Sequence, residues 1–588
     1  MCGIFGYVGE PVDLGLSLTT ALKTLEYRGY DSWGIAVGHG QRILVEKDVG
    51  RLNGSVPSFP DSSIGFGHTR WATHGGVTKA NAHPHLDGSG RIAVVHNGII
   101  ENYRVLKAGL QDRGLQFRSE TDSEVIAHLI QQEIAGGHDL TAAMARTFDR
   151  LTGLNAVIAM DIGTREMVAV KNVSPLIAGV GCHGVTIASD SLALRPHADR
   201  VIYLDDHHLI KLTRDGISLY ERETLRALVP RYTPLDRSNR DADLGSYPHF
   251  MMKEIAEQPG VLSRLATTGV DTAIALAAAI ERSELTVMTG CGSAGYAALS
   301  GSYLLSSLAG RFVPAFVGSE FKYHRRLLSP NALIIALSQS GETADLIEAM
   351  MLARSAGARL GALVNVEHST LDRMVGLTFP LRAGPEQCVL ATKSYLAKLA
   401  ALTMTAYALA ADVNRGQELV TRAAKGIAEM LRSSLSRQVA DLAAMVVKHD
   451  HMFVIGRGLA FPTALEAALK IKEASYIHAE AFAGGELKHG VIALVTDGTP
   501  CLVFAPADET RADVISGATE LKSRGAFVIG VSPDPDPVFD VHLAVPEAGA
   551  AAPMVNAVPA QLLAYQLALL RGNNPDRPRN LAKSVTVK

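Results

Sequence analysis

The second residue of the chain is a cysteine, in the run Met1–Gly6. Removal of Met1 would place the thiol of Cys2 beside a free α-amino group, and an amine with a pKa near ~8 can accept the thiol proton directly or through one water. The resulting thiolate is the attacking species. The apolar run Ile4–Val8 predicts a buried strand that presents Cys2 to a site. We therefore predict that Cys2 is a nucleophile.

Three short polar groups in the first part of the chain contain side chains that could serve a thiol nucleophile. They are Gly67–Gly75, His96–Gly98 and Ser119–Glu124. Arg70 in the first group suits a substrate carboxylate, because a guanidinium binds one bidentately. In the second group the amide of Asn97 and the N–H of Gly98 suit an oxyanion hole. Asp122 in the third group suits a substrate ammonium. Each group alone also fits a turn or a helix cap.

Two glycine- and serine-rich turns in the second half of the chain suit phosphate binding. Gly290–Gly295 reads GxGxxG after an apolar strand, and Glu320 lies near the position of the acidic residue of a dinucleotide site. Ser338–Thr343 follows another apolar strand, so its hydroxyls and a helix N-terminus form a second anion cradle at the same sheet edge. One phosphate with sugar hydroxyls fits this pair better than a dinucleotide, and a dehydrogenase remains an alternative.

Acidic and basic side chains share one face of a helix predicted further along the chain. Glu466, Lys470 and Glu473 are spaced i, i+4 and i+7, and Glu486–Gly490 follows them. Ala and Leu residues occupy much of the remaining circumference, which indicates a partly enclosed face. Charged helix faces are usually solvated, whereas enclosed charges are typical of functional sites.

The residues before about position 248 form a different kind of domain from those after it. Residues 1–225 combine short alternating strands with helices, which is an α+β pattern. The clearest strands are Arg42–Val45, Ile92–Val95 and Val168–Val170, and two helices are predicted at Leu14–Leu25 and Ser123–Ile134. Residues 226–247 are rich in Arg, Asp, Pro and Ser and are predicted to be a linker.

After the linker, long Ala- and Leu-rich helices alternate with apolar strands, and this pattern runs twice. The predicted strands are Leu285–Gly290 and Leu333–Leu337 in the first round, then Met452–Gly458, Cys501–Phe504 and Phe527–Val531 in the second. The alternation predicts two α/β domains with parallel sheets.

The composition restricts the partners. The 588 residues are 47% hydrophobic and 20% charged with a formal net charge of -3, so we expect no nucleic-acid surface and no polybasic membrane patch. Five cysteines without a CxxC pair predict no metal site, no cofactor and a reducing, cytoplasmic setting. No signal peptide or apolar stretch of membrane-spanning length is evident. Small molecules are the expected partners.

Taken together, these motifs resemble those of the isomerising glutamine:fructose-6-phosphate amidotransferases, the glucosamine-6-phosphate synthase family. The resemblance runs over nearly the whole chain, through Cys2–Gly6, Tyr27–Ser32, His68–Gly75, His96–Asn102, Ser338–Asp345, Glu466–His489 and Pro578–Val587. It implies an N-terminal-nucleophile glutaminase domain (an α+β sandwich) followed by two sugar isomerase (SIS) domains of α/β parallel-sheet type, in a homodimer. The implied boundaries are 1–225, a linker at 226–247, SIS domains at 248–425 and 426–570, and a catalytic tail at 571–588.

The resemblance also implies roles in glutamine hydrolysis. Cys2 would attack the carboxamide, Asn97 and Gly98 would stabilise the oxyanion, and Arg70 and Asp122 would hold the carboxylate and the ammonium of glutamine. The remaining glutamine-binding residues would be Trp71, which would also gate an ammonia passage, and Thr73, His74 and Gly75.

For the sugar, the resemblance implies a Schiff base on Lys583, ring opening by His489 of a neighbouring subunit, and proton transfer between C1 and C2 by Glu473, supported by Glu466 and Lys470. The implied sugar-phosphate ligands are Ser293, Ser338, Gln339, Ser340, Thr343, Val389 and Ala582. The implied reaction is the conversion of glutamine and fructose 6-phosphate to glucosamine 6-phosphate and glutamate, the first step of amino-sugar synthesis.

Two residues depart from the family pattern where the sugar is expected. Ala294 and Ala391 stand where the family usually has hydroxyl side chains. Each lost hydrogen bond is worth about 0.5–1.5 kcal/mol, so the same chemistry on a different ketose phosphate remains an alternative. A SIS-type regulator that only binds a sugar phosphate is another, although such a sensor would need neither Cys2 nor Lys583.

Overall fold

A computed structural model describes residues 2–52, 56–235 and 243–585. Contacts between residues divide the chain into two compact units. The first is Met1–Asn239 with Ser584–Lys588, and the second is Arg240–Lys583.

The first unit contains two antiparallel sheets. The eight-stranded sheet has the order β15-β11-β9-β10-β1-β4-β2-β3, with β1 Gly3–Val12, β2 Ser32–His39, β3 Arg42–Val49, β4 Ser62–Arg70, β9 Ile177–Gly181, β10 Gly184–Ala188, β11 Arg200–Tyr203 and β15 Thr233–Pro234. The seven-stranded sheet has the order β14-β13-β12-β8-β7-β6-β5, with β5 His85–Leu86, β6 Ile92–Gly98, β7 Asn155–Asp161, β8 Glu166–Lys171, β12 His208–Thr213, β13 Gly216–Glu221 and β14 Ala227–Leu228. Its helices are α1 Leu14–Leu25, α2 Tyr103–Gln111, α3 Glu124–Ala135 and α4 Leu140–Phe148.

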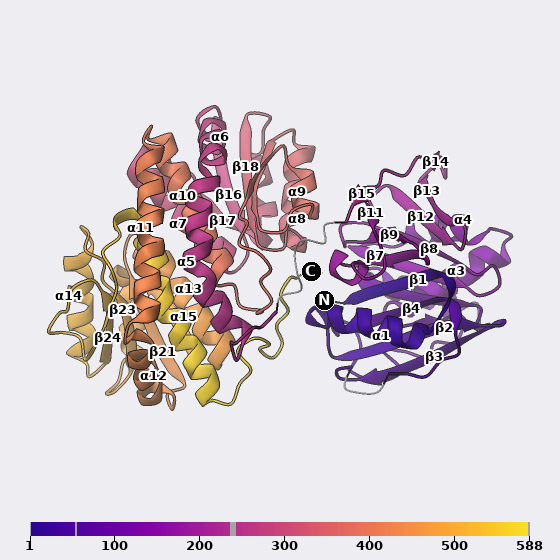
Figure 1. Ribbon diagram of the computed structural model, residues 1–588, viewed down its shortest axis with the longest axis horizontal. Coiled ribbons are helices and arrows are strands. Elements are labelled where there is room, and N and C mark those ends of the chain that lie inside the picture. Colours follow the sequence, from indigo (N-terminus) through magenta and orange to yellow (C-terminus); the bar gives the residue numbers. More distant parts are fainter. Residues whose placement is uncertain (1, 53–55, 236–242, 586–588) are drawn as a thin grey trace. The chain divides into compact units, whose positions relative to one another are not determined.

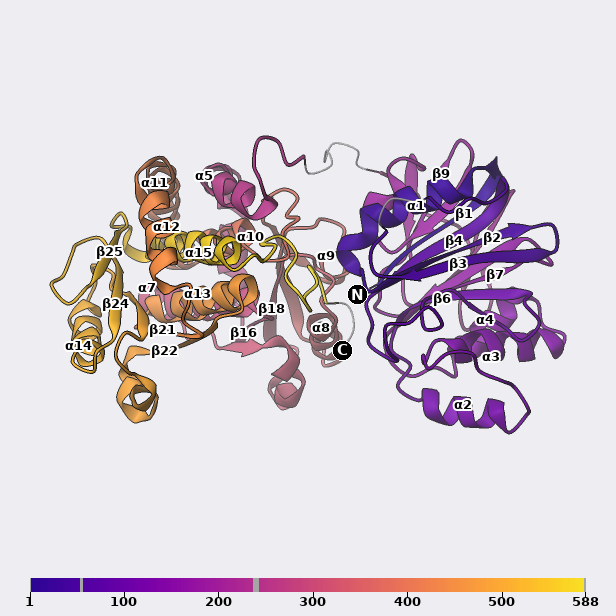
Figure 2. The same ribbon diagram turned by 90° about the horizontal axis from the view of Figure 1, so that it is seen from below.

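These elements form a four-layer α-β-β-α sandwich. One apolar core lies between the two sheets, a second lies between the seven-stranded sheet and α2 to α4, and a third lies between the eight-stranded sheet and α1. Figure 1 shows α1 lying along β1 and β4, and Figure 2 shows α3 and α4 beside β6. This confirms the predicted α+β sandwich.

Strand β1 is buried on both faces because successive side chains point to opposite sides of a sheet. Ile4 and Val8 pack between the sheets, while Phe5 and Tyr7 pack toward α1. The strand pairs with β4 on one side and with β10 on the other. Cys2 directly precedes this central strand, so its backbone position is fixed by the sheet.

The second unit contains two five-stranded parallel sheets. The first has the order β17-β16-β18-β19-β20, with β16 Leu285–Gly290, β17 Ala315–Val317, β18 Ala332–Ser338, β19 Arg359–Val364 and β20 Leu377–Pro380. The second has the order β22-β21-β23-β24-β25, with β21 His451–Gly456, β22 His478–Ala483, β23 Pro500–Phe504, β24 Phe527–Ser532 and β25 Val541–Ala544. In both sheets the second strand in chain order lies at one edge, followed by the first, third, fourth and fifth. The predicted duplication requires this shared order.

Long helices join the two sheets of the second unit through one apolar core. They are α5 Phe250–Thr268, α6 Val270–Glu281, α7 Ser293–Ala309, α10 Lys393–Leu409, α11 Val413–Arg432, α12 Leu435–Val446, α13 Ala460–Ser475 and α15 Ala552–Leu570. Helices α8 Ala344–Ser355 and α9 Thr370–Met374 pack in a separate core with the first sheet, and α14 Arg511–Lys522 packs in another with the second sheet. Helices α13 and α15 lie side by side (Figure 2), and α13 also contacts α7 of the first half. The side chains of α13 are therefore held between the two halves of this unit.

Among the described residues, no single helix is long and apolar enough to cross a membrane. Helices α5 and α6 pass that test only as a pair, with a bend of 67° between them. Their apolar side chains, including Ile255 and Leu276, belong to the core that they share with α10 and α11.

The sequence patterns locate most elements but not all. The predicted helix Leu14–Leu25 is α1, and the predicted strand Leu285–Gly290 is β16. Helices α2 and α4 were not predicted, because each is only 9 residues long and lacks an extended apolar stripe. The predicted linker 226–247 contains the short strands β14 and β15, and its residues 236–242 lie outside the described part of the chain.

Candidate active sites

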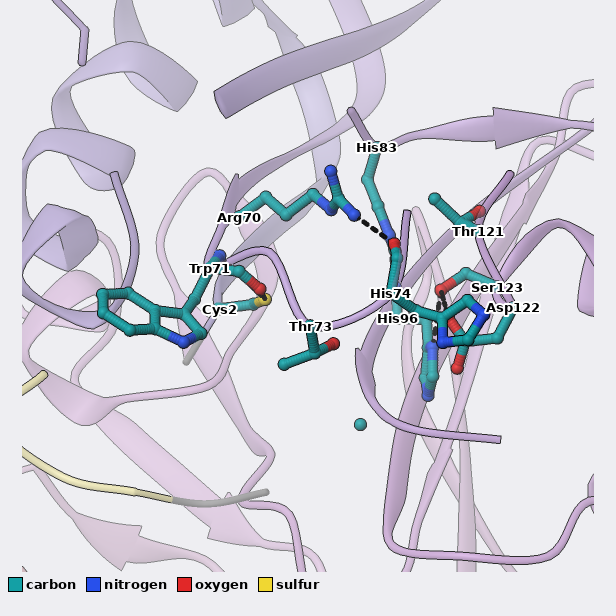
Figure 3. Close-up of a pocket in the computed structure, with 11 residues that line it drawn as sticks. Cys2, Arg70, Trp71, Thr73, His74, His83, His96, Thr121, Asp122 and Ser123 are labelled. Carbon is teal, nitrogen blue, oxygen red and sulfur yellow. Dashed lines mark hydrogen bonds between the residues drawn. The ribbon is translucent and has the colours of Figure 1, made fainter. Parts of the chain in front are cut away.

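A pocket in the first unit gathers most of the residues that the sequence predicts around a thiol nucleophile, although Gly75 and Asn97 are not among its lining residues. Its lining residues are Cys2, Arg70, Trp71, Thr73, His74, His83, His96, Gly98, Thr121, Asp122 and Ser123. In Figure 3 the side chains of Arg70, Thr73 and His74 lie on one side of Cys2, and the indole of Trp71 extends to the other. The pocket combines residues from the end of β4, the end of β6 and the start of α3.

The thiol of Cys2 contacts the backbone of Trp71. The Trp71 N–H donates to Sγ at 3.3 Å, and Sγ lies 3.6 Å from the Trp71 carbonyl oxygen. Burial raises the pKa of the Cys2 thiol, although the Trp71 N–H and the guanidinium of Arg70 act in the opposite direction. A thiol with a raised pKa requires a base before it can attack.

The oxyanion-hole candidates lie at the end of β6. The amide nitrogen of Asn97 donates to the carbonyl oxygen of Cys2 at 3.0 Å, so the amide lies beside the nucleophile. Gly98 has φ +141°, and a Cβ there would meet the carbonyl oxygen of Leu154 at 2.2 Å. No side chain fits at that position, which leaves the backbone of Gly98 free to line the pocket.

Arg70 organises the loop that follows β4. Its guanidinium donates to the carbonyl oxygens of Gly76 at 3.0 Å and Gly75 at 3.1 Å, and also to that of His74. These three bonds use three of the five N–H groups of a guanidinium. The ring of His74 packs edge-on against Tyr103, with 4.4 Å between centroids. Arg70 therefore fixes the predicted glutamine-binding residues His74 and Gly75 beside Thr73.

Asp122 stands at the opposite wall of the pocket. Its carboxylate accepts the N–H of Ile100 at 2.7 Å, which ties the start of α3 to the end of β6. The neighbouring Ser123 hydroxyl lies 2.8 Å from Nδ1 of His96. His96, Thr121 and Ser123 belong to the predicted polar groups but had no predicted role of their own, and His83 lies outside those groups. Only the folded sheets bring these four residues to Cys2.

The second unit brings together the charged face predicted on α13. Lys470 lies between Glu473, to which it donates a hydrogen bond, and Glu466, at 3.7 Å. Ser293, the first residue of α7, donates to Glu466 at 3.0 Å. Burial raises the pKa of Glu466 to about 7, and Glu473 acts in the same direction. The two halves of the unit thus meet at this cluster.

Lys583, near the end of the chain, is bound to a buried carboxylate. Its Nζ lies 2.6 Å from Oε2 of Glu386, whose side chain is completely buried. Glu386 also accepts the backbone N–H groups of Thr392 and Ser394, each at 3.0 Å. Although burial opposes ionisation, Lys583 lowers the pKa of Glu386 to about 2. The sequence analysis did not identify Glu386, because its run showed no charge pattern.

The segment before Lys583 is pinned to the same region. The Asp576 carboxylate accepts the N–H groups of Phe250 and Met251 at the start of α5, at 2.9 and 2.7 Å. The carbonyl oxygen of Asp576 accepts the N–H of Val389 at 3.0 Å. The predicted residue Val389 thus lies on the segment that carries Glu386, and the predicted residue Ala582 lies directly before Lys583.

The predicted phosphate loop follows β18. The hydroxyl of Ser338 accepts the N–H of Gly341 at 2.9 Å, and that of Ser340 accepts the N–H of Glu342 at 3.1 Å. Gly341 has φ +68°, which favours glycine. Thr343 is the N-cap residue of α8 and its side chain caps no N–H. Gln339, Ser340 and Thr343 thus line a tight turn at a helix N-terminus, as an anion cradle requires.

One predicted residue stays apart from the others. His489 ends the 3-10 helix η4 Gly484–His489 and is exposed. In the described part of the chain, His489 has no hydrogen bond or ion pair with Glu473 or Lys470. Within a single copy of this unit, the predicted ring-opening residue is not joined to the charged cluster.

Family models match both units. The model described as "Glutamine amidotransferase domain" matches residues 68–196, and the model described as "SIS domain" matches residues 280–408 and again residues 445–571. The two SIS matches confirm the predicted duplication, and all three matches confirm the predicted fold class.

Solved structures resemble the second unit. The C-terminal domain of glucosamine-fructose-6-phosphate aminotransferase from Francisella tularensis matches with a TM-score of 0.54 and 28% identity, over 57% of this chain and 100% of that one. A putative phosphosugar isomerase from Silicibacter pomeroyi matches with a TM-score of 0.50 and 26% identity, over 56% of this chain and 100% of that one.

Curated relatives match from end to end. A protein of Symbiobacterium thermophilum is 42% identical over 100% of both chains, and one of Thermus thermophilus is 40% identical, also over 100% of both. Both are named glutamine–fructose-6-phosphate aminotransferase (isomerising). With this similarity along its whole length, and with one amidotransferase and two SIS domains in the same order, the chain belongs to the family of isomerising glutamine–fructose-6-phosphate aminotransferases.

Proposed function

We propose that this chain transfers the amide nitrogen of glutamine to fructose 6-phosphate and isomerises the product to glucosamine 6-phosphate, releasing glutamate. The observation that carries the proposal is the pairing of two sites on one chain of this family. A partly buried thiol faces a polar pocket in the first unit, and a buried lysine–carboxylate pair accompanies a phosphate loop in the second.

In the glutaminase reaction, Cys2 attacks the carboxamide carbon of glutamine. The α-amino group exposed by removal of Met1 takes the thiol proton; Met1 itself lies outside the described residues. The C–S bond forms and the carbonyl oxygen becomes an oxyanion. The C–N bond then breaks as the protonated α-amino group returns its proton to the nitrogen, which leaves as ammonia. Water hydrolyses the resulting γ-glutamyl thioester to glutamate. The raised pKa of Cys2 supports the need for an adjacent base.

Asn97 and Gly98 stabilise the oxyanion of this reaction. The position of the Asn97 amide, 3.0 Å from the carbonyl oxygen of Cys2, supports this role. Removing one oxyanion-hole donor typically lowers kcat about 10²- to 10³-fold.

Glutamine is held at its α-carbon end by residues of opposite charge. Arg70 binds the carboxylate with its remaining N–H groups and Asp122 binds the ammonium. Thr73 and His74 line the pocket, and Gly75 follows them in the loop that Arg70 holds. Trp71 gates the path of ammonia away from the pocket. A water-poor path is needed because ammonia in water at pH 7 is mostly ammonium, which is not a nucleophile.

In the isomerase reaction, Lys583 attacks the C2 ketone of fructose 6-phosphate and forms a Schiff base, with loss of water. Ammonia displaces the lysine, and Glu473 moves a proton between C1 and C2. Glu466 and Lys470 hold Glu473 in place, which their contacts on α13 support. Ser293, Ser338, Gln339, Ser340 and Thr343 bind the phosphate and sugar hydroxyls, with Val389 and Ala582 beside them.

His489 assists ring opening from the neighbouring subunit of a homodimer. Its exposure and its lack of contact with Glu473 in one described copy of the unit support a role across an interface. We also propose a cytoplasmic location for the protein. For the domain boundaries we propose a glutaminase domain at 1–225, SIS domains at 248–425 and 426–570, and a catalytic tail at 571–588.

The test is to supply glutamine labelled with ¹⁵N in its amide together with fructose 6-phosphate. The expected result is ¹⁵N in the amino group of glucosamine 6-phosphate, detected by mass spectrometry. Label that stays in free ammonia with every ketose phosphate tried would overturn the proposal. Because Ala294 and Ala391 depart from the family pattern, the panel includes other ketose 6-phosphates.

A further inference from the structure

Four histidines form a buried cluster at the glutamine pocket, and two of them, His83 and His96, line it. His68, His83, His85 and His96 are each at most 4% exposed. The rings of His68 and His83 are stacked with 4.2 Å between centroids, and those of His83 and His85 are 4.6 Å apart. Among the described residues, no group of His, Cys, Asp and Glu side chains is arranged to hold a metal ion. Burial lowers the pKa of His68 to about 3, so its ring is neutral at pH 7.

The contacts of His68 determine which of its ring nitrogens carries the proton. Its Nε2 lies 3.1 Å from the backbone carbonyl oxygen of His96, which can only accept a hydrogen bond. Nε2 of His68 is therefore the protonated nitrogen. The same Nε2 lies 3.2 Å from the side-chain amide of Asn97, so the amide atom on that side must be the oxygen, Oδ1.

A second backbone carbonyl fixes the other side of the Asn97 amide. The amide nitrogen lies 3.0 Å from the carbonyl oxygen of Cys2, again an atom that can only accept. His68 and the Cys2 carbonyl thus hold the amide from opposite sides, with its N–H groups toward the nucleophile. A flipped amide would present its oxygen to the Cys2 carbonyl and to a developing oxyanion, both of which would repel it.

We propose that His68 is a positioning residue for glutamine hydrolysis, which orients the Asn97 amide so that its N–H groups face the oxyanion. The inference rests on the proposed role of Asn97. His68 itself is not among the residues that line the pocket. Its stack on His83, whose Nδ1 accepts the His96 N–H at 3.2 Å, holds the His68 ring in the plane that this contact needs.

The test compares two isosteric substitutions. The amide nitrogen of glutamine occupies about the place of imidazole Nε2, whereas the amide group of asparagine reaches only the place of Nδ1. His68→Gln therefore keeps a donor toward Asn97, and His68→Asn removes it. We expect His68→Asn to lower kcat for glutamate release about 10- to 100-fold with KM for glutamine within about 3-fold, and His68→Gln to stay within about 5-fold of wild type.

Alkylation of Cys2 by iodoacetamide separates positioning from damage to the fold. This displacement at a CH₂ carbon forms no oxyanion, so its rate at Cys2, followed by peptide mass spectrometry, should stay within about 2-fold in His68→Asn. His128→Asn is the matched control, because His128 on α3 is similarly buried in the same unit but packs against Phe117. We expect it to keep kcat within about 2-fold.

A double variant connects His68 to Asn97. Adding His68→Asn to Asn97→Ala should lower kcat by no more than about 2-fold beyond Asn97→Ala alone, because the group that His68 orients is already gone. The proposal is overturned if the two losses multiply, if His68→Gln is as inactive as His68→Asn, or if alkylation slows in parallel with hydrolysis. Full activity of Asn97→Ala would instead refute the oxyanion role of Asn97 in the proposed function.

Discussion

The two sites of this chain solve different chemical problems with different kinds of side chain. Around Cys2 the charged groups are few, and the supporting cluster of His68, His83, His85 and His96 is neutral because burial lowers the pKa of each ring. Around Lys583 and α13 the supporting groups are ionisable. Burial raises the pKa of Glu466 to about 7 and lowers that of Lys398 to about 8.

This difference follows from what each reaction needs. Acyl transfer develops charge on one oxygen, and fixed N–H dipoles stabilise it without moving a proton of their own. Isomerisation of a sugar moves protons between neighbouring carbons, so groups with a pKa near neutrality are useful. Buried lysine and glutamate side chains reach that range when desolvation is only partly offset by a partner.

The largest expected effect separates the two sites completely. Cys2→Ala should lower glutaminase kcat by at least about 10³-fold, because no other described group replaces the thiol. The second unit should keep its fold and its binding of fructose 6-phosphate, measured by calorimetry. Cys182→Ala, at an exposed cysteine, is the control and should keep full activity. Glutamate release by Cys2→Ala at the wild-type rate would refute the nucleophile assignment.

The converse experiment removes the amine of the second site. Lys583→Arg keeps a positive charge beside Glu386 but cannot form a Schiff base, so borohydride should no longer trap fructose 6-phosphate on the protein, as judged by intact mass. Lys522→Ala is the control, because Lys522 on α14 is an exposed lysine paired with Asp540. Trapping that persists in Lys583→Arg would assign the Schiff base to another lysine.

A smaller effect is the pH dependence of stability that the buried carboxyl group of Glu466 causes in the second site. A carboxyl group whose pKa is raised in the folded protein stabilises the fold below its unfolded pKa, and this contribution is lost as the pH rises through the folded pKa. For Glu466 the loss falls between pH ~4.5 and ~7 and amounts to about 3 kcal/mol. Glu466→Gln has no ionisable group at this position, so the variant does not lose stability in this way as the pH rises. Its free energy of unfolding relative to that of wild type should therefore rise by about 2–3 kcal/mol from pH 5 to pH 8.

Urea unfolding at both pH values provides this measurement for Glu466→Gln. Glu418→Gln on α11 is the matched control, since Glu418 is exposed and pairs with Arg415 on the surface. A relative stability of Glu466→Gln that does not change with pH would show that Glu466 is ionised at both values.

The smallest effect concerns substrate choice. Ala294→Ser restores a hydroxyl that the family pattern places at the start of α7, where Ala294 is 9% exposed. One added hydrogen bond of about 0.5–1.5 kcal/mol would lower KM for fructose 6-phosphate about 2- to 10-fold. An unchanged KM for fructose 6-phosphate and a changed KM for another ketose phosphate would reveal a different preferred sugar. Glutaminase kcat serves as the internal control.

The sequence by itself determined the local motifs and the order of the domains. Apolar runs that end in Gly or Ser predicted β1, β16 and β18, because local periodicity and turn residues depend only on neighbours along the chain. It also placed Glu466, Lys470 and Glu473 on one face of a helix, since the spacing of α-helical turns is fixed.

Only the tertiary structure decided which distant groups meet. Glu386 and Lys583 are 197 residues apart and form a pair at 2.6 Å. His68 on β4 of the eight-stranded sheet reaches Asn97 on β6 of the seven-stranded sheet. Neither contact follows a period along the chain. Burial then set the protonation of these groups, because desolvation depends on everything packed around a side chain, which a list of residues does not contain.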